Sequence, residues 1–355
     1  MLFKMLLEIN MNNLKKLGVE LMSKAKVVVT MGDPAGIGPE IVVKSLSKDK
    51  VNEWANIVVV GDVDVLEQAN SVIKNDVKFN SIKKVSEANF ENGIINVIDL
   101  DNIDVETFEL GKVSPEGGQA AYDYIEKAHE LCVNNEVDAM ATTTINKESL
   151  NAAGISLLGH TAILKDLNQL DADPLTMFEV DSLRVIFYSK HVSLKQATEL
   201  ITKEGIKEYV HLSHQALEKM GVENPKVAVA GLNPHNGEHG LFGDEEVNYI
   251  IPAIEELQAE GEVDVYGPIG ADSVFYQALN GKYDGVLSLY HDQGHIATKT
   301  YNHDLTISIT HGLPYLRTSV DHGTAFDIAG TGVASEISLD EAVRLAALYA
   351  PNFKK

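Results

Sequence analysis

The sequence predicts an α/β fold of two lobes, and three observations lead to this prediction. The chain has 355 residues, of which 45% are apolar, so it is too long for one simple core and long enough for two. Short apolar runs rich in β-branched residues alternate with stretches of helical periodicity. These runs are polar on neither face, as expected of parallel strands that helices cover on both sides.

The runs and the periodic stretches define the expected elements in order. We expect strands at residues 27–31, 57–60, 94–100, 137–142, 184–188, 227–230 and 286–290. We expect helices at residues 39–46, 117–133, 193–201, 206–220, 244–260 and 339–350. No Pro-, Gly- or Ser-rich linker divides the chain, so the lobes are expected to exchange strands. We assign residues 22–145 and 310–355 to the first lobe, residues 146–309 to the second, and residues 1–21 to an N-terminal extension of no assigned role.

Composition and charge exclude several classes of protein. Lys and Arg total 29 against 52 Asp and Glu, and the resulting formal charge of -23 repels nucleic acids and anionic membranes. No run approaches the ~18 apolar residues that span a bilayer, and the N-terminal segment carries no small-residue cleavage site. We therefore expect a cytoplasmic protein that binds a small molecule and neither nucleic acid nor membrane. The single cysteine, Cys132, belongs to a set of apolar residues that recur at helical spacing, so we expect it in the core.

A glycine-rich segment follows the first expected strand. In Met31-Gly32-Asp33-Pro34-Ala35-Gly36-Ile37-Gly38-Pro39-Glu40, Gly36 and Gly38 allow close backbone approach, and Pro39 suits the first turn of a helix whose free N–H groups can bind an anion. The segment is similar to a nucleotide-binding loop, but its spacing matches no standard fingerprint, and a tight strand-to-helix turn would need much the same residues. Both interpretations stay open.

Histidines gather in the later part of the chain, and three of them share one setting. His191, His235 and His291 each come just after an expected buried strand, where ligands collect in parallel α/β proteins. Three such imidazoles could converge on one divalent metal and leave positions open for substrate oxygens. The alternative is a set of hydrogen-bonded structural histidines. Asp292 could ligate the metal, orient a ligand or act as a base.

Cations are scarce, so those beside glycines and apolar residues are candidates for binding an anion. Arg317 could hold a phosphate or carboxylate through its planar guanidinium, with Lys299 as a second positive charge. Lys147 ends another strand pattern and is a third candidate. A structural ion pair is the alternative for each, because acidic partners are abundant in this chain.

Several ordered motifs together resemble the 4-hydroxythreonine-4-phosphate dehydrogenases over roughly residues 26–350. The motifs are the glycine-rich segment, Gly159-His160-Thr161, His191-Val192-Ser193-Leu194, Gly231-Leu232-Asn233-Pro234-His235, Tyr290-His291-Asp292-Gln293-Gly294 and Arg317-Thr318-Ser319-Val320-Asp321-His322-Gly323-Thr324. The resemblance implies the fold of the isocitrate and isopropylmalate dehydrogenases, with an active-site cleft between two α/β lobes, and a homodimer. It also implies NAD or NADP as cofactor without a Rossmann fingerprint.

The resemblance implies roles for individual residues. His191, His235 and His291 match ligands of one divalent ion, which could be Zn, Mg, Co or Mn. Substrate contacts are implied for His160, Thr161, Lys299, Arg317 and Ser308, and cofactor contacts for Gly36, Gly38, Asn233 and Asp321. Asp292 or Lys147 would transfer the proton, and the sequence does not choose between them. Ser308 stands where many members have an asparagine, and Ala162 stands where a glutamate is frequent, so the substrate stays open.

The reaction implied is oxidation of a secondary alcohol by hydride transfer to nicotinamide, followed by loss of CO2, with a metal that assists both steps. The substrate would be 4-(phosphooxy)-threonine, giving 3-amino-2-oxopropyl phosphate. The alternative is 4-phospho-D-threonate or 4-phospho-D-erythronate, giving dihydroxyacetone phosphate, because Ile145-Asn146-Lys147-Glu148 and His191-Val192-Ser193-Leu194 look more like that branch. A metal-dependent sugar-phosphate lyase or hydrolase without nicotinamide, and a non-catalytic binding protein, are the alternatives of other classes.

Overall fold

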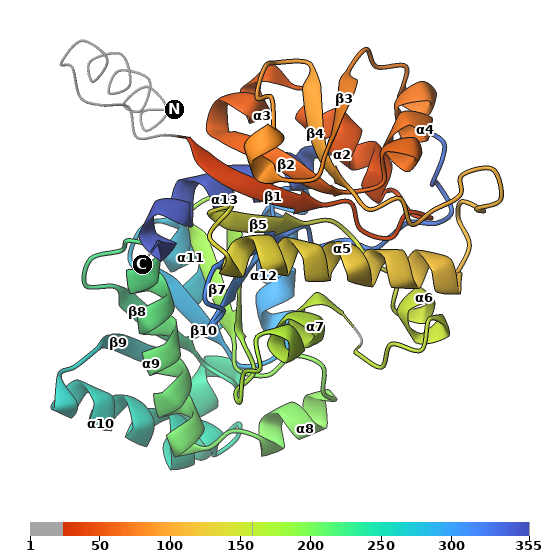
Figure 1. Cartoon of the computed structure of the whole chain (residues 1–355). Coiled ribbons are helices and arrows are strands. Elements are labelled where there is room, and N and C mark those ends of the chain that lie inside the picture. The colour runs from red at the N-terminus through yellow and green to blue at the C-terminus, as the bar shows by residue number, and fades with distance from the viewer. Residues whose placement is uncertain (1–23, 158, 355) are drawn as a thin grey trace, which may run out of the picture.

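A single mixed sheet organises the molecule (Figure 1). The computed structural model describes residues 24–157 and 159–354, and the extension assigned to residues 1–21 lies outside them. Within the described residues the sheet has twelve strands in the order β3-β4-β2-β1-β5-β12-β11-β6-β7-β10-β8-β9. The strands are β1 (Ala25–Thr30), β2 (Ala55–Gly61), β3 (Lys78–Ile82), β4 (Ile94–Asp99), β5 (Ala139–Thr142), β6 (Leu175–Val180), β7 (Leu183–Phe187), β8 (Lys226–Ala230), β9 (Asp264–Ile269), β10 (Gly285–Ser288), β11 (Ile307–His311) and β12 (Leu316–Ser319).

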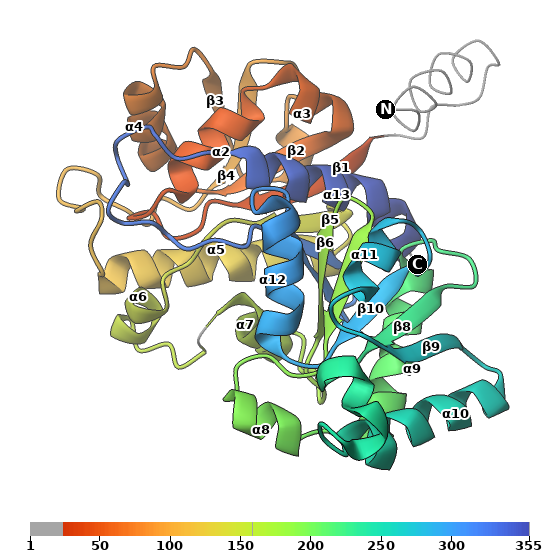
Figure 2. The ribbon, with the colours of Figure 1, turned by 180° about the vertical axis from the view of Figure 1, so that it is seen from behind.

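Helices cover both faces of this sheet. They are α2 (Gly38–Leu46), α3 (Asp49–Trp54), α4 (Val63–Ile73), α5 (Pro115–Val133), α6 (Lys147–Ala152), α7 (His160–Leu167), α8 (Leu194–Glu199), α9 (Lys203–Lys219), α10 (Ile251–Glu260), α11 (Val274–Leu279), α12 (His291–Asn302) and α13 (Ile337–Phe353). In one half of the sheet, α5 packs on β1, β2 and β5, and α13 packs on β1, β5 and β12 from the other side. In the other half, α9 packs on β8 and β10, and α12 packs on β6 and β7 from behind (Figure 2).

The α/β class is confirmed, but the expectation of a parallel sheet is correct only within each half. The strands from β3 to β12 in the sheet order are parallel, and so are β7, β10, β8 and β9. Between these groups β11 pairs antiparallel with β12 and β6, and β6 pairs antiparallel with β7. The two halves of the sheet therefore run in opposite directions. Five strands of the described residues were not expected from apolar runs. Buried polar side chains interrupt β6, β11 and β12, and β3 and β9 are only partly buried strands at the two margins of the sheet.

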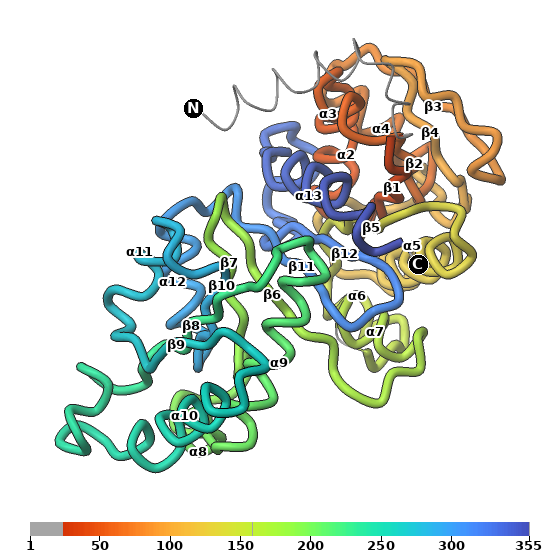
Figure 3. Tube along the Cα trace, turned by 90° about the vertical axis from the view of Figure 1, so that its left-hand side faces the viewer, coloured from red at the N-terminus to blue at the C-terminus, as the bar shows by residue number. Residues whose placement is uncertain are grey.

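Chain direction in the second half places the candidate histidines at one edge. Segments from both ends of the chain gather at one end of the molecule, and the green to cyan segments lie at the other (Figure 3). There β10 pairs in parallel with β7 on one side and with β8 on the other. Because parallel strands end at the same edge of a sheet, the residues that follow β7, β10 and β8 emerge side by side.

Three smaller expectations can be compared with the structure. The helix expected at residues 244–260 consists of a π-helical turn, Glu246–Ile250, that leads into α10. Cys132 is buried in α5, as expected, and burial raises the pKa of its thiol. Within the described ranges, no helix is long and apolar enough to cross a membrane.

Candidate active site

A buried strip of hydroxyl groups and one guanidinium crosses the middle of the sheet. Thr318 Oγ1 donates to the Ala342 carbonyl of α13, so the alternation of side chains turns Arg317 to the opposite face of β12. Cross-strand neighbours share a face, and Arg317 is paired with Thr310, which is paired with Thr176. We call these residues the polar strip. Its members are Thr142, Thr176, Ser308, Thr310, Arg317 and Ser319, all buried.

Arg317 is a buried cation that has no counter-ion among the residues that the structure describes. Its Nη2 and Nε donate to Thr142 Oγ1 at 2.7 and 3.1 Å, and its Nη1 donates to Thr310 Oγ1 at 3.0 Å. No carboxylate of the described residues forms an ion pair with it, although its side chain is only 4% exposed. Burial lowers the pKa of Arg317 to about 10. The alternative of a structural ion pair is therefore wrong for Arg317, and an anion from outside the chain fits here.

His160 lies beside this guanidinium, at the start of α7. The preceding Gly159 has φ 124°, which favours glycine. Burial, and then the charge of Arg317, lower the pKa of His160 well below its ordinary value, so the ring is neutral at pH 7. Its Nε2 is buried and finds no hydrogen-bond partner among the described residues. Thr161 follows in the same helical turn. An unpartnered ring nitrogen next to a cation fits the prediction that His160 contacts substrate.

Two of the three predicted metal ligands lie close together. The ring centroids of His191, after β7, and His291, at the start of α12, are 6.1 Å apart. His291 Nδ1 lies 2.7 Å from Asp292 Oδ1. With the Nδ1 proton directed at this carboxylate, Nε2 is left free to bind a metal. The pKa of His191 is lowered, mainly by burial, which favours the neutral imidazole. The neutral imidazole is the form that binds a metal ion. These donors suit a divalent ion.

His235 does not join the other two within one chain. Its side chain is 73% exposed beyond β8, and its ring lies 6.2 Å from that of Phe242. No three His, Cys, Asp or Glu side chains in residues 24–157 and 159–354 are placed to hold a metal ion together. The three-histidine site is thus not assembled in a single chain, and the ligation of one ion by all three stays a prediction.

The backbone that carries His235 has an unusual conformation, which a buried glutamate supports. Residues 235–239 all have positive φ, between 44° and 75°, a region that costs about 1–2 kcal/mol per non-glycine residue. Fully buried Glu246, in the π-helical turn, accepts hydrogen bonds from the backbone N–H groups of Leu232 and Asn233 at 2.8 and 2.7 Å. Sequence reasoning missed Glu246. The Asn233 side chain, predicted to contact cofactor, donates to Glu245 and Glu246 instead.

Helix α12 carries two further groups toward the segment after β12. Lys299 Nζ lies 2.8 Å from Asp321 Oδ2, so Lys299 is ion-paired and is not a second free cation. His295 lies between them and His291, with its ring 4.3 Å from that of His291. Burial lowers the pKa of His295 to about 4. The contact of Lys299 with substrate and the contact of Asp321 with cofactor stay predictions. The two residues form an ion pair with each other.

Two lysines lie near His191, and their charges contribute to the lowering of its pKa. Lys147 is exposed at the first turn of α6, and a Cβ added to Gly159 would lie 3.9 Å from its Cε, so Lys147 is close to the start of α7. Lys190 precedes His191 and donates to Thr176 of the polar strip. Sequence reasoning missed Lys190. Its position directly before a predicted ligand, in a chain with few cations, was the available signal.

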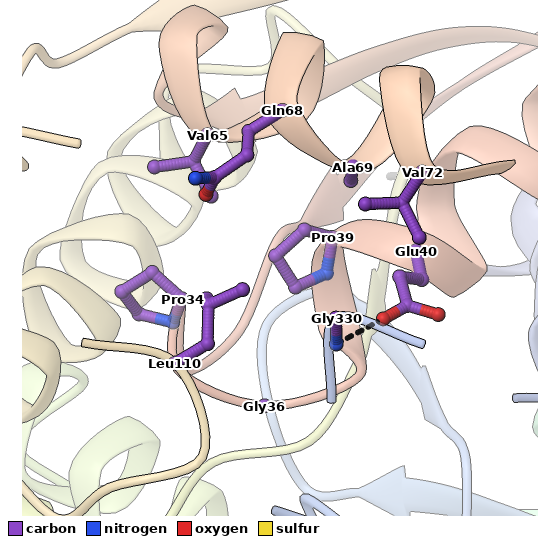
Figure 4. Close-up of a pocket in the computed structure, with 10 residues that line it drawn as sticks. All are labelled: Pro34, Gly36, Pro39, Glu40, Val65, Gln68, Ala69, Val72, Leu110 and Gly330. Atoms are coloured by element: carbon purple, nitrogen blue, oxygen red, sulfur yellow. Dashed lines mark hydrogen bonds between the residues drawn. The ribbon is translucent and has the colours of Figure 1, made fainter. Parts of the chain in front are cut away.

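The glycine-rich segment is tightly packed against other backbone, and a pocket lies beside it (Figure 4). A Cβ at Gly36 would lie 2.8 Å from the Thr324 carbonyl oxygen, and one at Gly38 would lie 2.2 Å from that of Met31. The Gly36 N–H donates to Asp33 O, and the Ile37 N–H to Thr324 O. The turn therefore accounts for both glycines, and their contact with cofactor stays a prediction. The pocket is lined by Pro34, Gly36, Pro39, Glu40, Val65, Gln68, Ala69, Val72, Leu110 and Gly330.

Known proteins share this sequence and fold. Residues 53–346 match the family described as "Pyridoxal phosphate biosynthetic protein PdxA". A relative from Fusobacterium nucleatum, provisionally named D-threonate 4-phosphate dehydrogenase, is 57% identical over 331 residues, 93% of this chain and 99% of the relative. A 4-hydroxythreonine-4-phosphate dehydrogenase structure from Klebsiella pneumoniae is 41% identical, with TM-score 0.85, and covers 93% of this chain and 99% of its own. One from Burkholderia phymatum is 41% identical, with TM-score 0.81, and covers 92% and 99%.

The fold, the site and these relatives define the class of protein, which is an α/β oxidoreductase of the dehydrogenase type. Within that class, the chain belongs to the PdxA family. The enzyme class predicted from the sequence and the resemblance seen in its motifs are both confirmed.

Proposed function

We propose that the chain oxidises and decarboxylates a phosphorylated four-carbon hydroxy acid, with NAD or NADP as hydride acceptor. The observation that carries this proposal is Arg317, a buried guanidinium that has no carboxylate partner in residues 24–157 and 159–354 and lies beside neutral His160, in a chain of net charge -23. Burying a cation costs free energy, and hydroxyl groups leave its charge unneutralised, so a bound anion fits here. An anionic substrate beside a histidine pair matches the family's dehydrogenase chemistry.

D-threonate 4-phosphate is the substrate we favour, with dihydroxyacetone phosphate and CO2 as products. The relative that carries this substrate in its name is 57% identical to the chain, whereas three structures named for 4-hydroxythreonine-4-phosphate are 41–43% identical. Ser308 supports the same order, because a hydroxyl in place of an amide changes which polar group of the substrate can be matched. We therefore favour the substrate that was the alternative in the sequence analysis over 4-(phosphooxy)-threonine, which was named first there.

Several residues of the candidate site have a proposed role in this reaction. When bound, the metal supplies Lewis-acid assistance and the nicotinamide accepts the hydride. Arg317 and His160 hold an anionic end of the substrate, and Asp292 fixes the tautomer of His291. Lys147 transfers the proton, because the Asp292 carboxylate is engaged by His291, and no hydrogen bond to the Lys147 amine is formed within the described residues. Gly36, Gly38, Asn233 and Asp321 stay the proposed cofactor contacts.

A second copy of the chain completes the metal site in this proposal. His191 and His291 approach each other, whereas exposed His235 stays outside any cluster of three ligands in the described part of one chain. A homodimer that brings His235 of one copy to the pair in the other would satisfy all three. Light scattering should give about twice the chain mass of 38.7 kDa for the active species. An active monomer would contradict this.

The deciding experiment measures NAD and NADP reduction by the purified protein with divalent metal. D-threonate 4-phosphate, D-erythronate 4-phosphate and 4-hydroxythreonine 4-phosphate are offered in parallel, and released CO2 is counted against reduced nicotinamide. We expect equal amounts of both products, loss of turnover on chelation, and loss of turnover in His191→Ala. His211→Ala is the histidine control and should keep its turnover, because His211 lies in α9 and is not a predicted ligand. Phosphate release or C–C cleavage without nicotinamide reduction would instead support the lyase or hydrolase alternative.

A further inference from the structure

Lys190 is a half-buried lysine held over the polar strip. It follows β7, where the Ser189 hydroxyl donates to the Leu289 carbonyl at 2.9 Å and fixes the backbone. The Lys190 amine donates to Thr176 Oγ1 at 2.9 Å. Its flexible stem is thus turned back across the sheet to β6 and away from solvent.

The polar strip connects Lys190 to Arg317 through two threonines. Thr176 on β6 is the direct cross-strand neighbour of Thr310 on β11, and such neighbours have Cβ atoms about 4.5–5.5 Å apart. Thr310 Oγ1 in turn accepts from Arg317 Nη1 at 3.0 Å. Two cationic groups therefore lie on one face of the sheet, on either side of a pair of hydroxyls.

Neither cation has a carboxylate partner among the described residues. The acid whose charge acts on Lys190 is Asp173, but this exposed carboxylate is paired with Lys165 at 2.7 Å. The chain has 52 acidic residues against 29 basic ones, so a structural partner was abundantly available. Two unpaired cations flanking hydroxyl donors form a site for an anion with more than one negative charge.

We propose that Lys190 and Arg317 together bind the phosphate group of the substrate, and that Lys190 is the residue that selects for the phosphorylated acid. The inference rests on the proposed function for the identity of the substrate. A phosphate monoester carries a charge of about -1.5 to -2 at pH 7, whereas a carboxylate carries only one. Two cations and two hydroxyls therefore match the phosphate end, and the histidine pair next to Lys190 is left for the reacting end.

Lys190→Met removes the charge and keeps the length of the side chain. We expect KM for D-threonate 4-phosphate to rise about 10- to 100-fold, as for a lost hydrogen bond to a charged group, with kcat changed less than about threefold. Turnover of unphosphorylated D-threonate should be unchanged, and Lys190→Arg should restore most of the affinity. Lys165→Met is the matched control, because it removes a half-buried lysine that is already paired with Asp173. An equal loss with both acids would assign Lys190 to the carboxylate and overturn the proposal.

A binding measurement separates this inference from the proposed function. Inorganic phosphate is titrated into chelator-treated protein and thermal stability is recorded, so that neither metal nor turnover is needed. We expect phosphate, but not acetate, to stabilise the wild type and the Lys165→Met variant, and to stabilise Lys190→Met much less. If no dehydrogenase activity is found while phosphate binding depends on Lys190, only the proposed function fails. If Lys190→Met binds phosphate as the wild type does, the inference fails.

Discussion

Arg317→Met tests whether this buried cation serves binding or stability. The lowering of its pKa to about 10 corresponds, at about 1.4 kcal/mol per pH unit, to a cost of about 3 kcal/mol for keeping the charge inside the protein. Against this stand the hydrogen bonds that Arg317 donates to two hydroxyl acceptors, Thr142 Oγ1, which Nε and Nη2 share, and Thr310 Oγ1, at about 1.5 kcal/mol for each acceptor, the lower end for a charged donor. The two contributions nearly cancel, so we expect the free energy of unfolding of the ligand-free variant to change by less than about 1.5 kcal/mol.

The assay is urea unfolding of the ligand-free protein, with and without inorganic phosphate. The wild type should gain about 2.7 kcal/mol at a phosphate concentration of 100 Kd, and Arg317→Met should gain almost nothing and lose turnover. Arg184→Met is the matched control, because Arg184 Nε lies 3.1 Å from Glu179 Oε2 in a buried ion pair. Breaking such a pair costs about 3–5 kcal/mol. A loss of that size in Arg317→Met, or an undiminished gain with phosphate, would refute the reasoning.

Three further predictions address specificity, acid stability and the His235 loop. Ser308→Asn should raise kcat/KM for 4-hydroxythreonine 4-phosphate relative to D-threonate 4-phosphate, by roughly tenfold in steady-state assays, and leave metal content unchanged; a flat ratio would remove Ser308 from specificity. Burial lowers the pKa of His311 to about 4, so the unfolded state binds its proton first and the free energy of unfolding should fall by about 3 kcal/mol between pH 6.5 and 4. In urea titrations of His311→Leu the decrease should be smaller by this amount, while the contributions of His160 and His295, whose pKa values burial also lowers, remain. The same decrease in the variant as in the wild type would show that His311 does not contribute to it. Glu246→Gln weakens the acceptor of the Leu232 and Asn233 N–H groups, so metal affinity should drop about tenfold, as measured by metal titration; unchanged affinity would separate Glu246 from the site.

The sequence prediction missed two kinds of strand. The strands β3 and β9 lie at the two margins of the sheet and are only partly buried, so they carry no continuous apolar run, whereas the others are buried but polar. Segments such as Val27, Val28 and Val29 are apolar on both faces, so hydrophobicity alone identified them. On β11 and β12, Ser308, Thr310 and Arg317 are equally buried but polar. A polar residue is normally interpreted as exposed, and it stays buried here because the strip belongs to the candidate site.

The candidate site was predicted in parts for a related reason. His191 and His291 could be predicted to lie close together because each follows a strand, and the two strands, β7 and β10, are parallel neighbours. The position of His235 could not be predicted in this way. Its loop depends on the hydrogen bond between the Leu232 N–H group and Glu246, which are 14 residues apart in irregular backbone. Nor could the strand positions show that Lys299 is paired with Asp321 while Arg317 is not, because ion pairing depends on tertiary contacts.

Helix α12 shows which signal the sequence did contain. His291, His295 and Lys299 are spaced four residues apart, which places them along one side of a helix. We expected a strand that ends at residue 290 and no helix directly after it, so this spacing was not used. In the structure α12 begins at His291, and eight residues of helix carry the side-chain positions about 12 Å along the sheet to Lys299. One helix thus connects the histidine pair, next to the proposed phosphate site, with Asp321 beyond β12, where a cofactor contact was predicted. Substrate and cofactor would then bind along the same side of α12, with His295 between them.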